Sequence, residues 1–246
     1  MTIPVITAPD PTPDGLSGVT VFLAGGISGC ADWQQMLIAK LTGTMVTAVN
    51  PRRPYGIAME GPEAVDQIAW ERRWLMHPHQ IDIISFWFPE ETLCPITLLE
   101  LGKALMLPKD VRVVVGCHPN YQRRFDVIEQ CKERPEITVV DTLHDLAGEI
   151  RAAAFQAQAE ASSDLSVCCN SIGVHMQAGR PQPDFDLDKG SNGLLSFRDW
   201  YEAWSNAYGG EALSERTERI CGLTGSTPVG LGMHEPELDI AAQELI

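Results

Sequence analysis

The stretch Trp87–Ala104 combines an apolar run, a polar turn and a helical segment that opens at Pro95. The helical part carries one carboxylate, Glu100. A helix that begins just beyond the carboxyl end of a parallel strand is where open α/β sheets bind their ligands, and the dipole at its N-terminus favours an ionised side chain. A carboxylate in this position could attack an electrophilic sugar carbon. Glu100 is therefore the primary candidate for catalysis.

The same residue has a purely structural interpretation. Thr97-Leu-Leu-Glu100 fits the capping box. In that motif a Ser or Thr opens a helix, and a Glu three residues later accepts a hydrogen bond from a backbone N–H group. Spacing alone leaves the catalytic and the structural role open.

A second carboxylate, Glu71, lies in a predicted helix together with Gln67 and Trp70. Residues three and four positions apart share one face of a helix. This face is either a half-buried Trp with solvated neighbours, or a surface on which a base stacks beside an acidic group.

The glycine-rich segment Gly25-Gly-Ile-Ser-Gly29 follows a predicted strand. It is either a simple turn into a helix or a loop whose backbone N–H groups hold a phosphate or a sugar hydroxyl. Its glycine order differs from G-x-G-x-x-G, and the chain lacks G-x-x-x-x-G-K-[ST], which disfavours a P-loop NTPase.

Two adjacent arginines, Arg52 and Arg53, come directly after another predicted strand. Such a pair in an acidic protein forms salt bridges at the surface in most cases. Its position at a strand end also allows one guanidinium group to reach an anion or a carboxylate near the site.

Apolar, strand-like runs alternate with helical stretches along the first two thirds of the chain. This alternation predicts a Rossmann-like or flavodoxin-like α/β domain, with a five-stranded parallel sheet and helices on both faces. The expected strands are 19–24, 45–49, 81–88, 111–115 and 137–140. The expected helices are 33–41, 63–76, 97–105, 125–131 and 143–161.

We expect three regions. Residues 1–17, rich in proline, are expected to be a disordered leader. The α/β domain spans 18–160. Residues 161–246 are expected to be an irregular C-terminal extension of unknown role, with Cys168–Gly173 irregular and short helices near 195–208 and 237–246.

The 246 residues carry a formal net charge of -15, with 44% hydrophobic and 21% charged residues. This charge argues against a nucleic acid polymer or an anionic membrane as the main partner. No apolar run reaches the roughly 18 residues of a membrane span, and we expect no signal peptide. We expect a cytoplasmic protein whose seven cysteines are reduced thiols, without a metal or cofactor.

Five motifs in order resemble the nucleoside 2-deoxyribosyltransferase-like family, in the branch whose helix has the sequence P-I-T-L-L-E-L-G. They are Phe22–Gly29 with Trp33, Asn50–Arg53, Gln67–Glu71, Ile81–Phe88 and Glu91–Gly102. Arg123–Val127 is similar to a later family segment, R-x-x-N-V, and the resemblance extends over about residues 19–152. The best-known transferases carry an Asp six residues before the nucleophile, where this chain has Cys94, and an Asn where it has Asp126.

The resemblance implies cleavage of the N-glycosidic bond of a (deoxy)nucleoside, with Glu100 as the nucleophile. The retaining mechanism passes through an oxocarbenium-like transition state and a glycosyl-enzyme intermediate, from which a second base takes the sugar. Glu71 is the candidate acid for the leaving base. The substrate-binding candidates are Gly25, Gly26, Ile27, Ser28, Trp33, Arg52, Arg53, Gln67, Trp70, Trp87 and Thr97. A homo-oligomer is also expected from the resemblance.

Two other functions compete with this one. The first is hydrolysis of a nucleoside 5′-monophosphate, in which Ser28, Arg52 and Arg53 would hold the phosphate. The second is a non-catalytic nucleotide-binding module, in which Glu100 has no chemical role.

Overall fold

The computed structural model describes residues 2–11, 16–56, 60–76, 80–109, 111–177 and 214–221. The chain divides into two compact units. The first contains residues 1–14 and 18–158, and the second contains residues 15–17 and 159–246.

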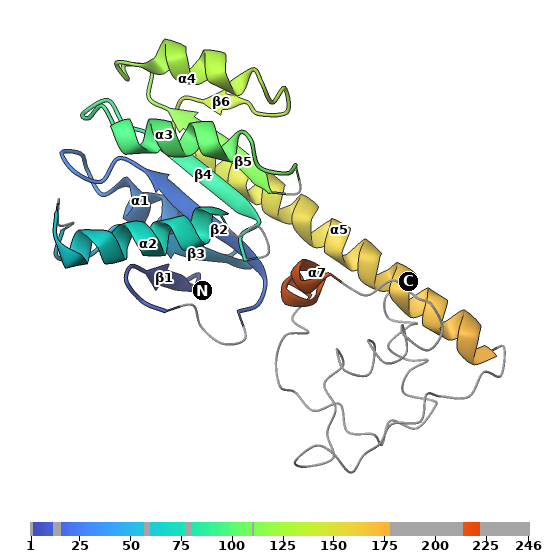
Figure 1. Ribbon diagram of the computed structural model, residues 1–246. Coiled ribbons are helices and arrows are strands. Elements are labelled where there is room, and N and C mark those ends of the chain that lie inside the picture. Colours follow the sequence, from blue (N-terminus) through green and yellow to red (C-terminus); the bar gives the residue numbers. More distant parts are fainter. Residues whose placement is uncertain are drawn as a thin grey trace. The chain divides into compact units, whose positions relative to one another are not determined.

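One parallel sheet forms the centre of the first unit (Figure 1). Its strands lie in the order β1-β3-β2-β4-β5-β6, and every neighbouring pair is parallel. This arrangement confirms the predicted α/β class, but the predicted number of five strands is wrong because the sheet has six. The strands are β1 (Val5–Thr7), β2 (Val19–Gly25), β3 (Val46–Asn50), β4 (Ile83–Phe88), β5 (Arg112–Cys117) and β6 (Val139–Val140).

The additional strand, β1, lies within the segment that was expected to be a disordered leader. It pairs with β3 along the edge of the sheet, and flanking bonds extend the contact: the Ala48 N–H donates to Pro4 O at 2.9 Å and the Ala8 N–H to Asn50 O at 3.0 Å. β1 has only three residues, between Pro4 and Pro9, and so short a segment shows no recognisable alternation of apolar and polar residues. The long-range pairing with β3 therefore decides this strand.

The central strands are buried along their length. All six residues of β4 are buried, as are all but the last residue of β2. A strand covered on both faces has a continuous apolar sequence rather than an alternating one. This is why both strands could be predicted from composition alone.

Helices cover both faces of the sheet. α2 and α3 lie together on one face, while α1 and the first part of α5 lie on the other (Figure 1). The guanidinium group of Arg151 in α5 donates a hydrogen bond to the carbonyl oxygen of Lys40 at the end of α1. The helices are α1 (Trp33–Lys40), α2 (Pro62–Met76), α3 (Pro95–Ala104), α4 (Arg124–Cys131), α5 (Leu143–Gln177) and α7 (Glu215–Ile220).

The second unit contains the later part of α5, beyond residue 158, and the short helix α7. The prediction of an irregular segment at Cys168–Gly173 is wrong, because α5 continues through it to Gln177. No proline interrupts this stretch. The Thr217 hydroxyl of α7 donates to the Asp164 carboxylate at 3.2 Å. The short helices expected at 195–208 and 237–246 lie outside the described residues.

The order of the strands indicates where a ligand is expected to bind. The chain turns from β2 to β3 on one side, and then crosses back over β2 to form β4 on the other. In doubly wound sheets the crevice at such a reversal, at the carboxyl ends of the strands, binds the ligand. Here that position lies beyond Gly25 of β2 and Trp87 of β4, which are register partners.

We predict that β1 contributes to stability through its buried side chain. Ile6 is 5% exposed and its neighbour Val5 is 41% exposed. Ile6→Ala should lower the free energy of unfolding by roughly 2–4 kcal/mol, because it leaves a cavity against the sheet. Val5→Ala, the matched control in the same strand, should change it far less. Denaturant unfolding measures both, and equal small effects would contradict a packed β1.

Candidate active site

A cavity of about 370 Å³ opens where the fold places the ligand site. Four segments contribute side chains or backbone to it: β2 with the loop after it, the residue after β3, α2, and α3 with the turn that leads into it. The lining comprises Phe22, Ala24, Gly25, Gly26, Ile27, Ser28, Pro51, Ala64, Gln67, Ile68, Glu71, Thr92, Cys94, Pro95, Ile96, Thr97 and Glu100.

Glu100 enters this cavity from α3. The helix begins at Pro95, with Cys94 as its N-cap in a left-handed conformation at a φ of 48°. Thr97 is therefore the third residue of the helix and Glu100 the sixth, so that the capping-box pairing of these two residues does not form. No hydrogen bond or ion pair joins the Glu100 carboxylate to another described residue. The side chain is thus available to a ligand.

The surroundings of Glu100 favour its protonated form. Burial and the neighbouring Glu71 carboxylate raise the pKa of Glu100 to about 8, while the Lys103 ammonium group partly opposes this shift. Desolvation and a like charge both penalise the ionised carboxyl. Near neutral pH, Glu100 therefore carries a proton.

Glu71 faces the same cavity from α2 and belongs to a polar chain. The Gln67 amide nitrogen donates to Glu71 Oε1 at 2.7 Å and to Pro51 O at 2.9 Å, and Arg53 Nε donates to Gln67 Oε1. Burial raises the pKa of Glu71, whereas the bond from Gln67 and the Arg53 charge lower it. Because these groups favour its ionised form, Glu71 should lose its proton more readily than Glu100.

At Gly25 and Gly26 the glycine-rich loop borders the cavity with backbone alone. A Cβ atom at Gly26 would lie 2.7 Å from Cys94 Sγ, and one at Gly25 would lie 2.4 Å from the Trp33 ring. Neither position has room for a side chain. The two glycines therefore allow the loop to pack directly against the start of α3.

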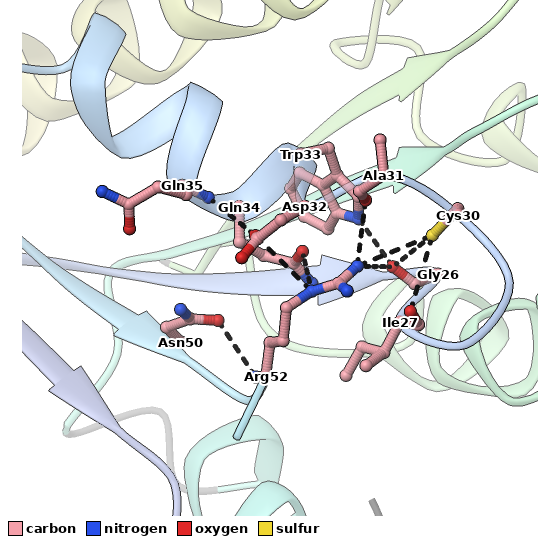
Figure 2. Close-up of polar contacts among 10 residues, drawn as sticks. All are labelled: Gly26, Ile27, Cys30, Ala31, Asp32, Trp33, Gln34, Gln35, Asn50 and Arg52. Carbon is pink, nitrogen blue, oxygen red and sulfur yellow. Dashed lines mark hydrogen bonds and ion pairs between the residues drawn. The ribbon is translucent and has the colours of Figure 1, made fainter. Parts of the chain in front are cut away.

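Arg52 and Trp33 contact the loop without lining the cavity. Figure 2 shows both side chains directed at the carbonyl oxygen of Gly26: Trp33 Nε1 donates to it at 2.7 Å and Arg52 Nη2 at 3.3 Å. Arg52 also donates to Ala31 O at 3.0 Å and to Gln34 Oε1 at 2.8 Å. Its guanidinium group is thus held by the protein itself.

Two predicted tryptophans also lie outside the cavity lining. Trp70 is 6% exposed, donates from Nε1 to Asp10 O at 2.7 Å, and packs between Phe22 and Trp74. Trp87 is 5% exposed and lies against Gly116 of the neighbouring strand. Both rings contribute to the core around the site.

The structure therefore brings together eight of the predicted site residues. Those that line one cavity are Gly25, Gly26, Ile27, Ser28, Gln67, Glu71, Thr97 and Glu100. Arg53 touches this group through Gln67.

Sequence reasoning missed Ile68 and Ile96 as lining residues. They are 60% and 63% exposed, on α2 and α3, and both line the cavity. Ile68 lies three positions before Glu71, so the helical spacing that grouped Gln67 with Glu71 contained the signal for it.

The described cysteine thiols are poor candidates for nucleophiles. Cys94 lines the cavity, but burial raises its pKa to about 12, and burial raises that of Cys117 to about 11. The thiolate is the nucleophilic form. At neutral pH these thiols are almost entirely protonated.

In the described part of the chain, no helix has the length and apolar character of a membrane span. Nor do three or more His, Cys, Asp or Glu side chains in those ranges gather in a way that could hold a metal ion.

Comparison with known proteins finds one family. Residues 18–121 match the model of the family described as nucleoside 2-deoxyribosyltransferase like. The match contains every cavity-lining residue and confirms the expected family, whereas the branch with the helix sequence P-I-T-L-L-E-L-G stays a prediction. It ends before Arg123–Val127, so the similarity of that segment stays a prediction. No curated protein matches the chain.

We predict that the buried carboxyl of Glu100 costs stability at high pH. Its pKa is raised in the folded chain from 4.5 to about 8, so folding takes up a proton in this window and stability falls as the pH rises through it. Glu100→Gln should remove this loss, on the order of 3 kcal/mol.

Denaturant unfolding at pH 5 and pH 8.5 measures the effect. The difference in the free energy of unfolding between Glu100→Gln and the original chain should grow with pH. The exposed α2 residue Glu63 gives the control, Glu63→Gln, for which the difference should stay constant. A constant difference for both variants would show that Glu100 is not buried as described.

Proposed function

Residues 18–121 form a nucleoside 2-deoxyribosyltransferase-like domain, and from this premise we propose that the chain cleaves the N-glycosidic bond of a nucleoside and transfers the sugar to a second base. One observation carries the proposal: Glu71 and Glu100 line the same cavity, and Glu100 is free of hydrogen bonds to the described residues. Two carboxyl groups in one cavity are the minimum that retaining glycosyl transfer requires.

In the first step the Glu100 carboxylate attacks the anomeric carbon of the sugar. The bond from that carbon to the base nitrogen breaks, and the base leaves with the electron pair. Glu71 gives its proton to the base and becomes a carboxylate, while Glu100 holds the sugar as an ester. One proton and one negative charge on the pair are sufficient for this step.

The second step reverses the first with a different base. The incoming nitrogen attacks the anomeric carbon, Glu100 leaves as a carboxylate, and Glu71 accepts the proton that the incoming nitrogen loses. The configuration at the anomeric carbon is inverted twice and therefore retained. Water in place of the second base would give free sugar.

The proton of the pair must be on the correct residue at the moment of attack. It lies mainly on Glu100, whose pKa is about 8. Transfer of this proton to Glu71 gives the reactive form, and burial, which raises the pKa of Glu71 as well, makes this transfer easier.

The charges around the cavity favour a nucleoside over a nucleoside 5′-monophosphate. None of the described residues that line it is Lys, Arg or His, and two are Glu. Arg52, one of the residues expected to hold a phosphate, already donates to Gly26, Ala31 and Gln34. A doubly charged phosphate would enter a cavity with two acidic groups, which is unfavourable without a cation to pair with it.

We predict that the purified chain exchanges bases between deoxynucleosides and that Glu100→Gln reduces the rate by at least about a thousandfold, because the nucleophile is lost. Chromatography of the products, with and without a second free base, measures the exchange. Glu63→Gln, on the exposed side of α2, is the matched control and should retain the original rate.

The same assay separates the competing functions. Free sugar instead of a new nucleoside would identify a hydrolase, and faster reaction of the 5′-monophosphate would reverse the proposed preference. Nucleoside binding without any turnover, unchanged in Glu100→Gln, would identify a non-catalytic module.

We predict a bell-shaped dependence of kcat/KM on pH. Above about pH 8 the pair loses its last proton and the leaving base loses its acid, so the rate should fall about tenfold per pH unit. At acidic pH both carboxyls are protonated and the nucleophile is lost. Glu71→Gln should abolish the alkaline fall, because the acid has already been removed. A rate that still rises above pH 9 in the original chain would contradict the role of Glu71.

A further inference from the structure

We infer that Arg52 and Trp33 act as positioning residues: by holding the Gly26 carbonyl they orient the Ile27 N–H group into the cavity, where it binds a hydroxyl oxygen of the substrate sugar. This inference rests on the proposed function, since it concerns the sugar that Glu100 attacks. It gives the two side chains a role although neither lines the cavity.

Three donors converge on a single carbonyl oxygen. Trp33 Nε1, Arg52 Nη2 and Cys30 Sγ lie 2.7, 3.3 and 3.2 Å from Gly26 O. Figure 2 shows Trp33 and Arg52 approaching it from one side and Cys30, in the loop itself, from the other. Three contacts fix the orientation of the peptide unit between Gly26 and Ile27 far more strongly than a turn requires.

The geometry of the peptide transmits this orientation to the opposite side. The Gly26–Ile27 bond is trans, so the Ile27 N–H points in the direction opposite to the Gly26 C=O. The carbonyl points towards residues outside the cavity lining, whereas Gly26, Ile27 and Ser28 belong to the lining. The N–H group consequently faces the cavity.

This N–H group is available as a donor. In the described part of the chain, Ile27 N donates to no backbone oxygen. A backbone donor beside a cavity is satisfied by water or by a ligand. The loop thus presents a preoriented donor that needs no rearrangement when a ligand binds.

The position of the loop indicates which part of the substrate it meets. Gly26 packs against Cys94 Sγ and Thr92, immediately before α3, and α3 carries Glu100. The sugar must lie within reach of the Glu100 carboxylate for attack at the anomeric carbon. The loop beside the start of α3 is therefore next to the sugar, whose hydroxyl oxygens accept hydrogen bonds.

The arginine is better suited to this task than a lysine. Its planar guanidinium group contacts Gly26 O, Ala31 O and Gln34 Oε1 at once, and a lysine ammonium group cannot reproduce this fixed fork. The ion pair with Asp32, at 3.5 Å, holds the same group from the start of α1.

Nucleoside binding to the full-length chain tests the inference. The background is Glu100→Gln, which prevents turnover, and the ligands are a 2′-deoxynucleoside and its 3′-deoxy and 5′-deoxy analogues. We expect the Ile27 amide resonance to shift on binding of the parent nucleoside, and to shift much less with at least one analogue. Arg52→Met should weaken binding of the parent roughly five- to tenfold, and binding of that analogue hardly at all.

Three further variants complete the experiment. Trp33→Phe keeps an aromatic side chain in the core but removes the N–H donor, so it should show the same selective loss, and denaturant unfolding checks that the chain stays folded. Arg52→Lys should recover little of the affinity. Arg73→Met, at an exposed arginine of α2, is the control and should bind like the background.

An Ile27 resonance that does not respond to the nucleoside would overturn the inference. So would an equal loss of affinity for the parent nucleoside and both analogues in the Arg52 and Trp33 variants, because that result would mean that they support only the fold. The base-exchange assay with the original chain judges the proposed function separately. If the chain exchanges bases but gives either of these results, the proposed function stands and the inference about Arg52 and Trp33 is wrong.

Discussion

The parallel pairing of β2 with β4 is the constraint on which the site depends. Gly25 and Trp87 are register partners at the carboxyl ends of these strands. This pairing places the loop after β2 beside the turn that leads into α3, although some seventy residues separate them in the chain. Gly25 and Gly26 permit the contact because no side chain fits between the loop and Trp33, Trp87 or Cys94. A slip of one residue in the register would separate Glu100 from the loop.

The electrostatics of the cavity follow from this placement. α2 and α3 each direct one carboxyl group into a largely apolar space, so burial raises the pKa of both, and the Glu71 charge raises that of Glu100 further. The two groups are not equivalent, because Gln67 and Arg53 support the ionised form of Glu71 and no described residue donates a hydrogen bond to Glu100. This difference favours the proton on Glu100, so the proposed roles of nucleophile and proton donor require its transfer to Glu71.

The two arginines after β3 make different contacts, which their adjacent positions in the sequence do not predict. Arg52 turns towards the loop and holds its carbonyl groups, whereas Arg53 turns towards Gln67 and through it influences Glu71. Neither guanidinium group belongs to the cavity lining. The positive charge near the site therefore organises the protein groups, and the cavity itself remains acidic.

The sequence by itself determined the class of fold and the central candidate. Continuous apolar runs identified β2 and β4 because both faces of these strands are buried, and helical spacing grouped Gln67 with Glu71. The motif around Glu100 pointed to the family whose model residues 18–121 match.

The tertiary structure alone decided the remaining points. β1 is a strand only because β3 offers it an unpaired edge, and Arg52 binds the loop only because the fold places Gly26 O within its reach. Trp70 and Trp87 became part of the core because neighbouring elements cover them. Each of these outcomes depends on contacts between residues far apart in the chain, and local spacing contains no information about such contacts.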